Sequence, residues 1–423
     1  MSPHENRSLT APEREMLAQA VLRPSDTSLN APLLFDVSGC GAERLCRAVT
    51  RVMAGHPSLH SVIVNDADGD AVAAVVPVGR GCRVERVDAL DDDAAVSLIR
   101  ALADVPFNLA GDEPLVRARV WTCGERAYLG LVLSHVIVDF TAMARILRDI
   151  GDAYEDPGMT PGPGTAPTRA DRVAGAEDYY RRLVRDRSEG LDNGLVPGRR
   201  PDAPLPGRVA VWRPGRRWSQ ALDTLAFTHR VAPVTVVLAC VAEAVRALGI
   251  AGEPVVSMSF SNRAPGDASV RNTVNVLPLE VPLNGGSVGE LFRRTHALVR
   301  RATRFESFCL RDALPVLAPD GYRGSTSADV AVTFYQEPMV FRTGPLVHRR
   351  VVVERSQVKF PLGISVSKDA DGYCFELDIA DALSESDPEA ILRTVFEHAL
   401  RSRREEPEAR LRDLPRDELS HRL

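Results

Sequence analysis

The residues with the clearest chemical potential are a histidine and an aspartate four positions apart. An apolar run, Leu129–Leu133, leads through Ser134 into His135, and Asp139 stands at the head of a segment with helical periodicity. A neutral imidazole at the end of a strand can take a proton from an attacking nucleophile. Structural roles fit the same residues, because Asp139 can cap the following helix and His135 can be a buried histidine with satisfied hydrogen bonds. With nine histidines, one such spacing arises easily by chance, so the motif alone does not decide between these roles.

The hydrophobic pattern places this pair between a strand and a helix, in a chain that alternates the two. Helical spacing of apolar residues predicts helices over 9–22, 43–54, 93–104, 140–154, 179–187, 234–248, 288–303 and 388–401. Short apolar runs predict strands over 33–37, 62–64, 72–78, 115–121, 127–133, 254–260, 274–281, 329–335, 351–354, 362–367 and 373–380. The proline- and glycine-rich stretch 156–168 reads as a linker or crossover. We therefore predict an α/β protein with two mixed halves of similar size.

Composition and charge narrow the class of protein. A chain of 423 residues is long enough for two or three domains, and 44% hydrophobic with 26% charged residues is typical of a soluble globular protein. The formal net charge of −5 argues against nucleic acid or an anionic membrane as a partner. No apolar run approaches the roughly 18 residues of a membrane span, and the N-terminus has no apolar signal core. We expect a soluble, cytoplasmic protein.

Cysteine and histidine spacing gives no indication of a metal site. The seven cysteines are scattered without a C-x-x-C pair, which favours small buried side chains in a reducing compartment. The other histidines lack the spacing of metal ligands, so we expect no metal. Arginine supplies nearly all the positive charge, and lysine occurs only at Lys359 and Lys368, a bias typical of GC-rich bacterial genomes.

Further motifs surround the His-x-x-x-Asp segment in a definite order. They are Leu9-Thr-Ala-Pro-Glu-Arg-Glu, His56-Pro-Ser-Leu-His60, Pro106-Phe-Asn-Leu109 with Pro114-Leu-Val-Arg117, Asn262-Arg263 with Asn272-Thr-Val-Asn275-Val-Leu-Pro278-Leu, and Lys359-Phe-Pro-Leu362. Through this ordered set the chain resembles, over nearly its whole length, a free-standing condensation domain of the non-ribosomal peptide synthetase type. No single motif carries the resemblance; their order does.

The resemblance implies a fold and three roles. The family has two chloramphenicol-acetyltransferase-like α/β lobes in a V shape, with a tunnel between them. Here the lobes would span 1–160 and 161–423, and a segment near 325–345 would cross from the second lobe to the first. His135 would be the catalytic residue midway along the tunnel. Asp139 would point away from the tunnel and pair with Arg263, which would hold the active-site loop in place.

Two positions depart from the family motif H-H-x-x-x-D-G. Ser134 replaces the first histidine, a position that varies in related acyltransferases, and Phe140 replaces the glycine. We expect Ser134, Phe140, Asn275 and Gln336 to line the tunnel, although the two amides are equally compatible with buried structural roles. The Phe140 ring either reshapes the acceptor pocket, turns into the core, or marks a chain that has lost catalysis.

The function implied is acyl transfer from a thioester to an amine or a hydroxyl, giving an amide or an ester in natural-product or antibiotic biosynthesis. The donor would be the phosphopantetheine arm of an acyl or peptidyl carrier protein acting in trans, and no metal or redox cofactor is required. His135 would take the acceptor's proton or stabilise the tetrahedral intermediate. Two alternatives stay open: a coenzyme A-dependent O- or N-acyltransferase of the same superfamily, and a non-catalytic condensation-like scaffold that recruits a partner enzyme.

Overall fold

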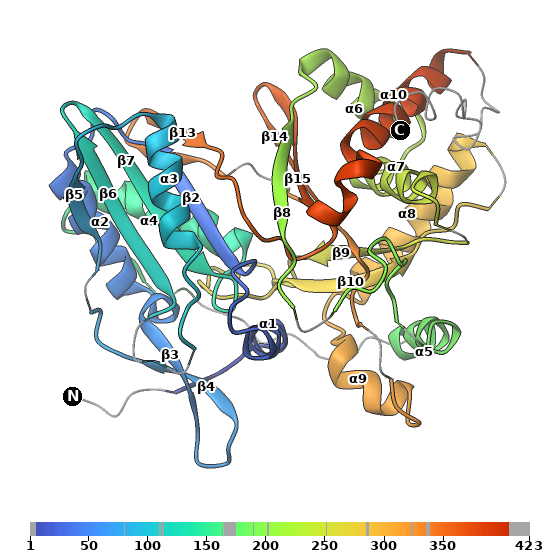
Figure 1. The fold of residues 1–423 in the computed structure, drawn as a ribbon, viewed down its shortest axis with the longest axis horizontal. Coiled ribbons are helices and arrows are strands. Elements are labelled where there is room, and N and C mark those ends of the chain that lie inside the picture. The colour runs from blue at the N-terminus through green and yellow to red at the C-terminus, as the bar shows by residue number, and fades with distance from the viewer. Residues whose placement is uncertain are drawn as a thin grey trace.

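The computed structural model describes residues 6–79, 81–109, 111, 114–162, 164, 175–188, 190–200, 203–250, 252–284, 287–322, 325–335 and 339–405. Within these residues, helices and strands alternate and build two large β-sheets with helices packed against them. Figure 1 shows the two sheets side by side and diverging toward the top of the view, so the molecule has a V-shaped outline. The predicted two-lobed α/β architecture is therefore confirmed.

The N-terminal half of the chain, blue to green in Figure 1, carries the His-x-x-x-Asp segment between its last strand and the next helix. Its elements are β1 (Arg7–Ser8), α1 (Ala11–Leu22), β2 (Asn30–Asp36), α2 (Ala42–Gly55), the 3-10 helix η1 (Pro57–His60), β3 (Ser61–Asn65), β4 (Ala71–Val75), β5 (Arg83–Arg86), α3 (Asp92–Ala103), β6 (Val116–Cys123), β7 (Arg126–Ser134) and α4 (Phe140–Glu155).

The C-terminal half, green to red in Figure 1, supplies the second large sheet and its helices. Its elements are α5 (Ala176–Asp186), β8 (Gly207–Trp212), α6 (Arg216–Thr228), α7 (Pro233–Ala247), β9 (Val255–Phe260), β10 (Asn275–Glu280), α8 (Val288–Arg304), α9 (Leu310–Leu317), β11 (Val330–Phe334), β12 (Phe341–Thr343), β13 (Leu346–Val351), β14 (Leu362–Asp369), β15 (Gly372–Ala380), the 3-10 helix η2 (Asp381–Ser386) and α10 (Pro388–Glu405).

The strand order shows that a segment of the C-terminal half joins the sheet of the N-terminal half. One large sheet has the order β12-β13-β2-β7-β6-β5, the other has the order β10-β9-β11-β14-β15-β8, and β1-β4-β3 forms a small third sheet. β12 and β13 come from the C-terminal half, yet β13 pairs antiparallel with β2, with Val351 opposite Leu34. The strands that cross thus occupy 341–351, whereas β11 immediately before them still belongs to the second sheet. The lobe boundary near residue 160 stays a prediction.

Local sequence explains where the helices begin. The Thr10 hydroxyl accepts from the Glu13 amide at 3.2 Å, and the Glu13 carboxylate accepts from the Thr10 amide, so the two residues form a capping box at the start of α1. Ser287 and Glu290 form the same motif at α8. Asp139 caps α4, accepting from the Ala142 amide at 2.8 Å.

Some elements differ from the sequence prediction. The strand expected over 351–354 is wrong, because the pairing residues are Leu346–Val351, whose exposed and buried side chains do not alternate. Without alternation, a strand near a sheet edge gives no period-2 signal. The sequence pattern also missed α6, α9, β5, β8 and β12. Each of these five elements is either short or mixed in polarity.

The central strand β7 positions the His-x-x-x-Asp segment because it is buried on both faces. The eight residues that follow Arg126 in this strand are all buried, between α2 and α4 on one side and α3 on the other. Gly130 permits this packing, since a Cβ there would lie 2.3 Å from the Trp121 ring and 2.9 Å from Ile99. The end of β7, and with it His135, is therefore held by two cores.

The second sheet is covered by α7, in which every residue from Thr235 to Val245 is buried. Within the described residues, no single helix is both long and apolar enough to cross a membrane. Only α6 and α7 taken together, with a bend of 101° between them, meet that criterion of length and composition.

Candidate active site between the two sheets

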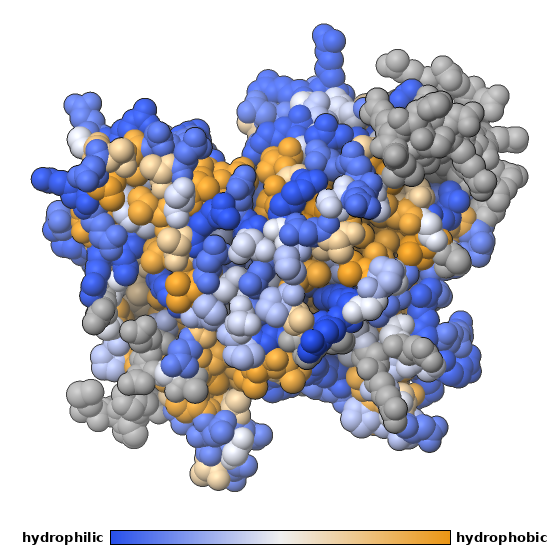
Figure 2. Space-filling view, viewed as in Figure 1, coloured by the Kyte–Doolittle hydropathy of each residue, from blue (hydrophilic) through white to orange (hydrophobic). Residues whose placement is uncertain are grey.

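A cavity of about 200 Å³ lies between the two large sheets. The N-terminal half contributes β2, His135 directly after β7, and the start of α4, and the C-terminal half contributes β9, β10, β11, β14 and β15. The crossing segment adds Arg350, Val353 and Arg355 from one side. Figure 2 shows that the molecular outline is notched between the two halves, above the region where they join. The cavity therefore receives side chains from both halves of the chain.

His135 lies in this cavity at the end of β7 and is held through its backbone. Its amide donates to the Leu29 carbonyl at 2.8 Å, and the Asn272 side-chain amide donates to the His135 carbonyl at 2.5 Å. Because Asn272 precedes β10 of the second sheet, the loop that carries His135 is fixed from both sides of the cavity.

The His135 ring is in one tautomer. Its Nδ1 lies 3.2 Å from the Val138 carbonyl oxygen, which can only accept, so Nδ1 carries the proton and Nε2 the lone pair. Nε2 makes no hydrogen bond to any described residue. Burial, followed by the positive charge of Lys359, lowers the pKa of His135 to about 4. His135 is therefore neutral at pH 7 and offers an unprotonated Nε2 to the cavity.

Asp139 combines the two roles considered from the sequence. Besides capping α4, its carboxylate oxygens both lie 2.9 Å from Nη2 of Arg263. It also accepts from the Thr273 amide at 2.9 Å and from the Thr273 hydroxyl at 3.0 Å. The side chain is buried, and these donors satisfy it.

Arg263 anchors the same junction from the second half of the chain. Its guanidinium also donates to the backbone carbonyls of Ser269 and Arg271, each at 2.9 Å. The pair between Asp139 and Arg263 is 2% and 8% exposed at its two side chains, and Arg263 also lies 3.5 Å from the Asp267 carboxylate. Loss of Asp139 would therefore leave a buried guanidinium with only this longer ion pair. This geometry agrees with a supporting role, because both Asp139 oxygens are occupied and unavailable to a substrate.

Phe140 lies in the cavity wall, where its ring also packs against the edge of the N-terminal core. Its ring stacks on Tyr335, at the end of β11, with ring centroids 3.6 Å apart and an interplanar angle of 15°. Both rings line the cavity. An aromatic pair between the two halves therefore occupies the space that a glycine would leave open, which favours the interpretation of a reshaped pocket.

The remaining tunnel predictions have different outcomes. Asn275 does not line the cavity; its amide donates to the carbonyls of Glu306 and Phe308 at 2.9 and 2.7 Å. Strand alternation explains this, because Val274 and Val276 are the positions that face the cavity.

Ser134 is buried beside the cavity and not on its surface. Its hydroxyl oxygen accepts from the Val136 amide at 3.3 Å. Gln336 lies outside the described residues.

The sequence pattern missed a polar row on the face of the second sheet. Ser259, Thr333 and Ser365 stand side by side on β9, β11 and β14, and the row ends at Glu376 on β15. The Ser259 and Thr333 hydroxyls are 2.8 Å apart, and all four residues line the cavity. Strand register places them together, and register cannot be read from one sequence.

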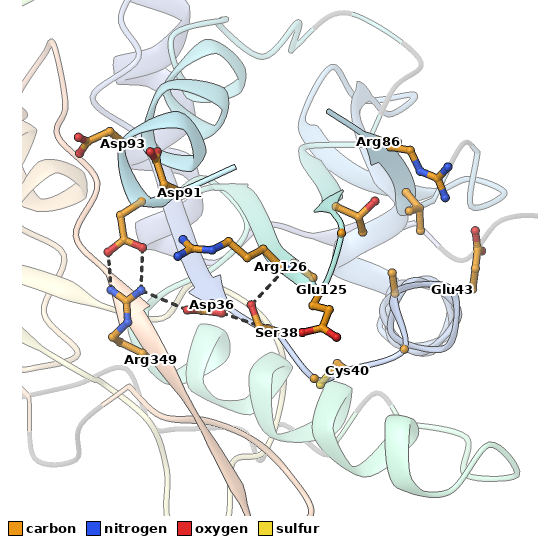
Figure 3. Close-up of a pocket in the computed structure, with 18 residues that line it drawn as sticks. Asp36, Ser38, Cys40, Glu43, Arg86, Asp91, Asp93, Glu125, Arg126 and Arg349 are labelled. Carbon is orange, nitrogen blue, oxygen red and sulfur yellow. Dashed lines mark hydrogen bonds and ion pairs between the residues drawn. The ribbon is translucent and has the colours of Figure 1, made fainter. Parts of the chain in front are cut away.

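A second, wider hollow lies at the opposite end of β7. From Arg126 to His135, at about 3.3 Å per residue, the separation is roughly 30 Å. Figure 3 shows Arg349 beside Asp36 in this hollow, with Cys40 and Glu43 across the view. Arg349 pairs with Asp36 at 3.2 Å and with Asp92 at 2.7 Å. No histidine is among the described residues that line this hollow.

Comparison with known proteins gives partial sequence matches. No protein-family model matches the chain. A stretch of 125 residues, 28% of the chain, is 34% identical to malformin synthetase mlfA of Aspergillus sclerotiicarbonarius. A stretch of 162 residues, 36% of the chain, is 26% identical to a plipastatin synthase of Bacillus subtilis. The matches span 2% and 6% of those synthetases, so the chain corresponds to a small part of each.

Solved structures match the whole described fold. The first condensation domain of the calcium-dependent antibiotic synthetase superimposes with a TM-score of 0.74 at 19% identity, covering 96% of this chain and 98% of that one. The X-domain from teicoplanin biosynthesis gives 0.75 at 17% identity, covering 98% of both chains. The starter condensation domain of rhizomide synthetase gives 0.76 at 16% identity, covering 97% of both. The resemblance predicted from the ordered motifs is thus confirmed: the chain has the fold of the condensation domains of non-ribosomal peptide synthetases.

Proposed function

We propose that this chain is a condensation-type acyltransferase that moves an acyl group from a carrier-protein thioester to an amine or a hydroxyl. The observation that carries the proposal is the neutral His135 ring, whose unprotonated Nε2 faces a cavity built by both halves of the chain. A thioester is already activated, so alignment and the transfer of one proton are what the protein has to provide.

In the proposed reaction, His135 is the only side chain that takes up and releases a proton. The acceptor nitrogen or oxygen attacks the thioester carbonyl carbon, and its proton passes to Nε2 during or after attack. The tetrahedral intermediate then collapses, the carbon–sulfur bond breaks, and the thiolate takes the proton. The products are an amide or ester and a free thiol. The fixed tautomer supports this role, because the Nδ1–H bond to Val138 keeps Nε2 directed into the cavity.

The support for a carrier-bound donor is the synthetase context of the similar structures, which include the first condensation domain of the calcium-dependent antibiotic synthetase and a four-domain nonribosomal peptide synthetase. Docking in trans is the corresponding proposal for this chain. Coenzyme A is the second candidate donor, because the starter condensation domain of rhizomide synthetase has been solved in complex with C8-CoA. Both donors present the same thioester to His135.

Intact-mass spectrometry of an acyl-loaded carrier protein, incubated with simple amines and alcohols, tests the proposal. Loss of the acyl mass from the carrier should require the wild-type chain and an acceptor, and His135→Ala should abolish it. His60→Ala is the matched control, because His60 is also partly exposed but does not line the cavity. If acyl-coenzyme A is consumed instead, the donor assignment changes; if wild type moves neither thioester, the scaffold alternative replaces catalysis.

A further inference from the structure

The charged residues that line the cavity are paired, with the exception of Lys359. Arg350 bonds to Glu376 at 2.7 Å, and Arg355 bonds to Asp378 at 2.9 Å. Asp139 is neutralised by Arg263. Lys359 lines the same cavity, but within the described part of the chain no carboxylate lies within ion-pair distance of its Nζ. Among the described residues that line the cavity, Lys359 therefore contributes one positive charge without a carboxylate in contact.

The contacts of the Lys359 ammonium are soft and apolar. Its Nζ lies 3.2 Å from the Met16 sulfur and 5.2 Å from the centre of the Phe360 ring. Neither group can neutralise a full charge. Burial lowers the pKa of Lys359 to about 8, against the attraction of the more distant Glu15 and Asp26. At pH 7 the side chain is still mainly protonated, so it is a poor general base.

The charge of Lys359 influences the cavity that His135 also lines. Its positive charge is the second cause, after burial, of the low pKa of His135, and both side chains line one cavity of about 200 Å³. A ligand that reaches Nε2 of His135 therefore lies in the field of Lys359. An anionic group on that ligand would supply the missing counter-charge of the ammonium.

We propose that Lys359 binds a carboxylate of the substrate, so that the acyl donor or the acceptor that reacts at His135 carries a free carboxylate group. This inference rests on the proposed acyltransferase function and names the substrate class of its site. The phosphate of a carrier arm is not the anion concerned, because the length of the pantetheine arm separates that phosphate from the reacting thioester. The two sources of the carboxylate, acyl chain and acceptor, are separated by experiment.

The chain offers a direct physical test, because it contains only two lysines. Lys368 is 43% exposed at its side chain and pairs with Asp223, so it serves as an internal reference for Lys359. With lysine labelled by ¹³C at Cε, NMR follows both ammonium groups through a pH titration. Lys359→Met assigns the two signals.

N-acetylglycine is the anionic probe, and N-acetylglycinamide is its neutral control. We expect N-acetylglycine to raise the apparent pKa of Lys359 by about one unit, equivalent to roughly tenfold tighter binding to the protonated form. N-acetylglycinamide should leave it unchanged, and neither probe should move Lys368. Equal responses of the two lysines, or no response of Lys359 to either probe, would overturn the inference.

Steady-state kinetics then show whether the donor or the acceptor carries the carboxylate. One arm compares carriers loaded with succinyl and with butyryl groups, and the other compares glycine with glycinamide as acceptor. In one arm the carboxylate-bearing substrate should have the higher kcat/KM by at least about tenfold, and Lys359→Met should bring that ratio to about one. Lys368→Met should leave the ratio as in wild type, and Lys359→Gln replaces the methionine variant if that protein does not fold.

The failures are distinguishable. If wild type transfers acyl groups but shows no preference for a carboxylate in either arm, the inference about Lys359 fails while the proposed function stands. If wild type transfers nothing, the proposed function fails, and the NMR titration alone decides whether Lys359 is an anion site.

Discussion

Replacing Asp139 with alanine removes the carboxylate that joins α4 to the loops before β10. Four donor groups lose this acceptor: the Ala142 amide, the Arg263 guanidinium, and the amide and hydroxyl of Thr273. Breaking a buried ion pair costs about 3–5 kcal/mol, and the loss of an N-cap costs about 1 kcal/mol within that total. Because Arg263 keeps its bonds to the Ser269 and Arg271 carbonyls, we expect the lower end, about 3 kcal/mol of unfolding free energy.

Urea unfolding, monitored by tryptophan fluorescence, measures this cost in unfolding free energy. Trp121 is in the N-terminal half and Trp212 in the C-terminal half, so circular dichroism should be recorded in parallel to test whether unfolding is two-state. Asp139→Ala should unfold at lower urea and lose activity in proportion to folded protein. Adding Arg263→Met removes the buried guanidinium that has lost its closest carboxylate, and should recover part of the loss.

The control is Asp267→Ala, which also removes a carboxylate near Arg263 but at 3.5 Å and without the cap of α4. Its cost should be smaller. A soluble Asp139→Ala protein with the urea midpoint of wild type and no activity would refute the reasoning and would assign Asp139 a chemical role.

Three further predictions concern the cavity. Phe140→Gly removes the stack on Tyr335 and should raise kcat/KM for bulky acceptors over small ones. In the same urea assay it should cost at least the roughly 1 kcal/mol of the aromatic pair, because the ring also packs against the core. Folding lowers the pKa of His135 from 6.5 to about 4, so between these pH values the unfolded chain binds more protons than the folded one. The unfolding free energy of wild type should therefore fall by about 3 kcal/mol from pH 6.5 to pH 4, relative to that of His135→Ala. Lys359→Met should raise the His135 pKa, moving the acidic limb of the transfer rate toward higher pH; an unmoved limb would contradict the coupling.

Much of the fold was predictable because its core elements have strong periodic signals. The amphipathic helices α2, α4 and α8 and the buried strand β7 lie close to their predicted ranges. The strand β13 was not predicted, for a physical reason. It pairs with β2 across more than 300 residues of sequence, and its exposed side chains show no alternation. Tertiary pairing, and not local preference, makes it a strand.

The candidate site was predictable where a motif fixes a local role. The positions of His135 and Asp139 could be predicted because one follows a strand and the other begins a helix. The pairing of Asp139 with Arg263 was predicted from the family resemblance. The polar row from Ser259 to Glu376 and the charge of Lys359 depend on register and on which face of the sheet meets the cavity. A single sequence does not contain that information, and the same limit explains why Asn275 was placed on the wrong face.

The most direct test of the account is the single-turnover rate of acyl transfer from a loaded carrier protein to an amine acceptor, for wild type and His135→Ala at pH 7. A positioned general base contributes about 10²–10⁴-fold, so the variant should be slower by that factor while its urea midpoint at pH 7 stays near that of wild type. Equal rates in the two proteins would contradict the claim that His135 carries the reaction.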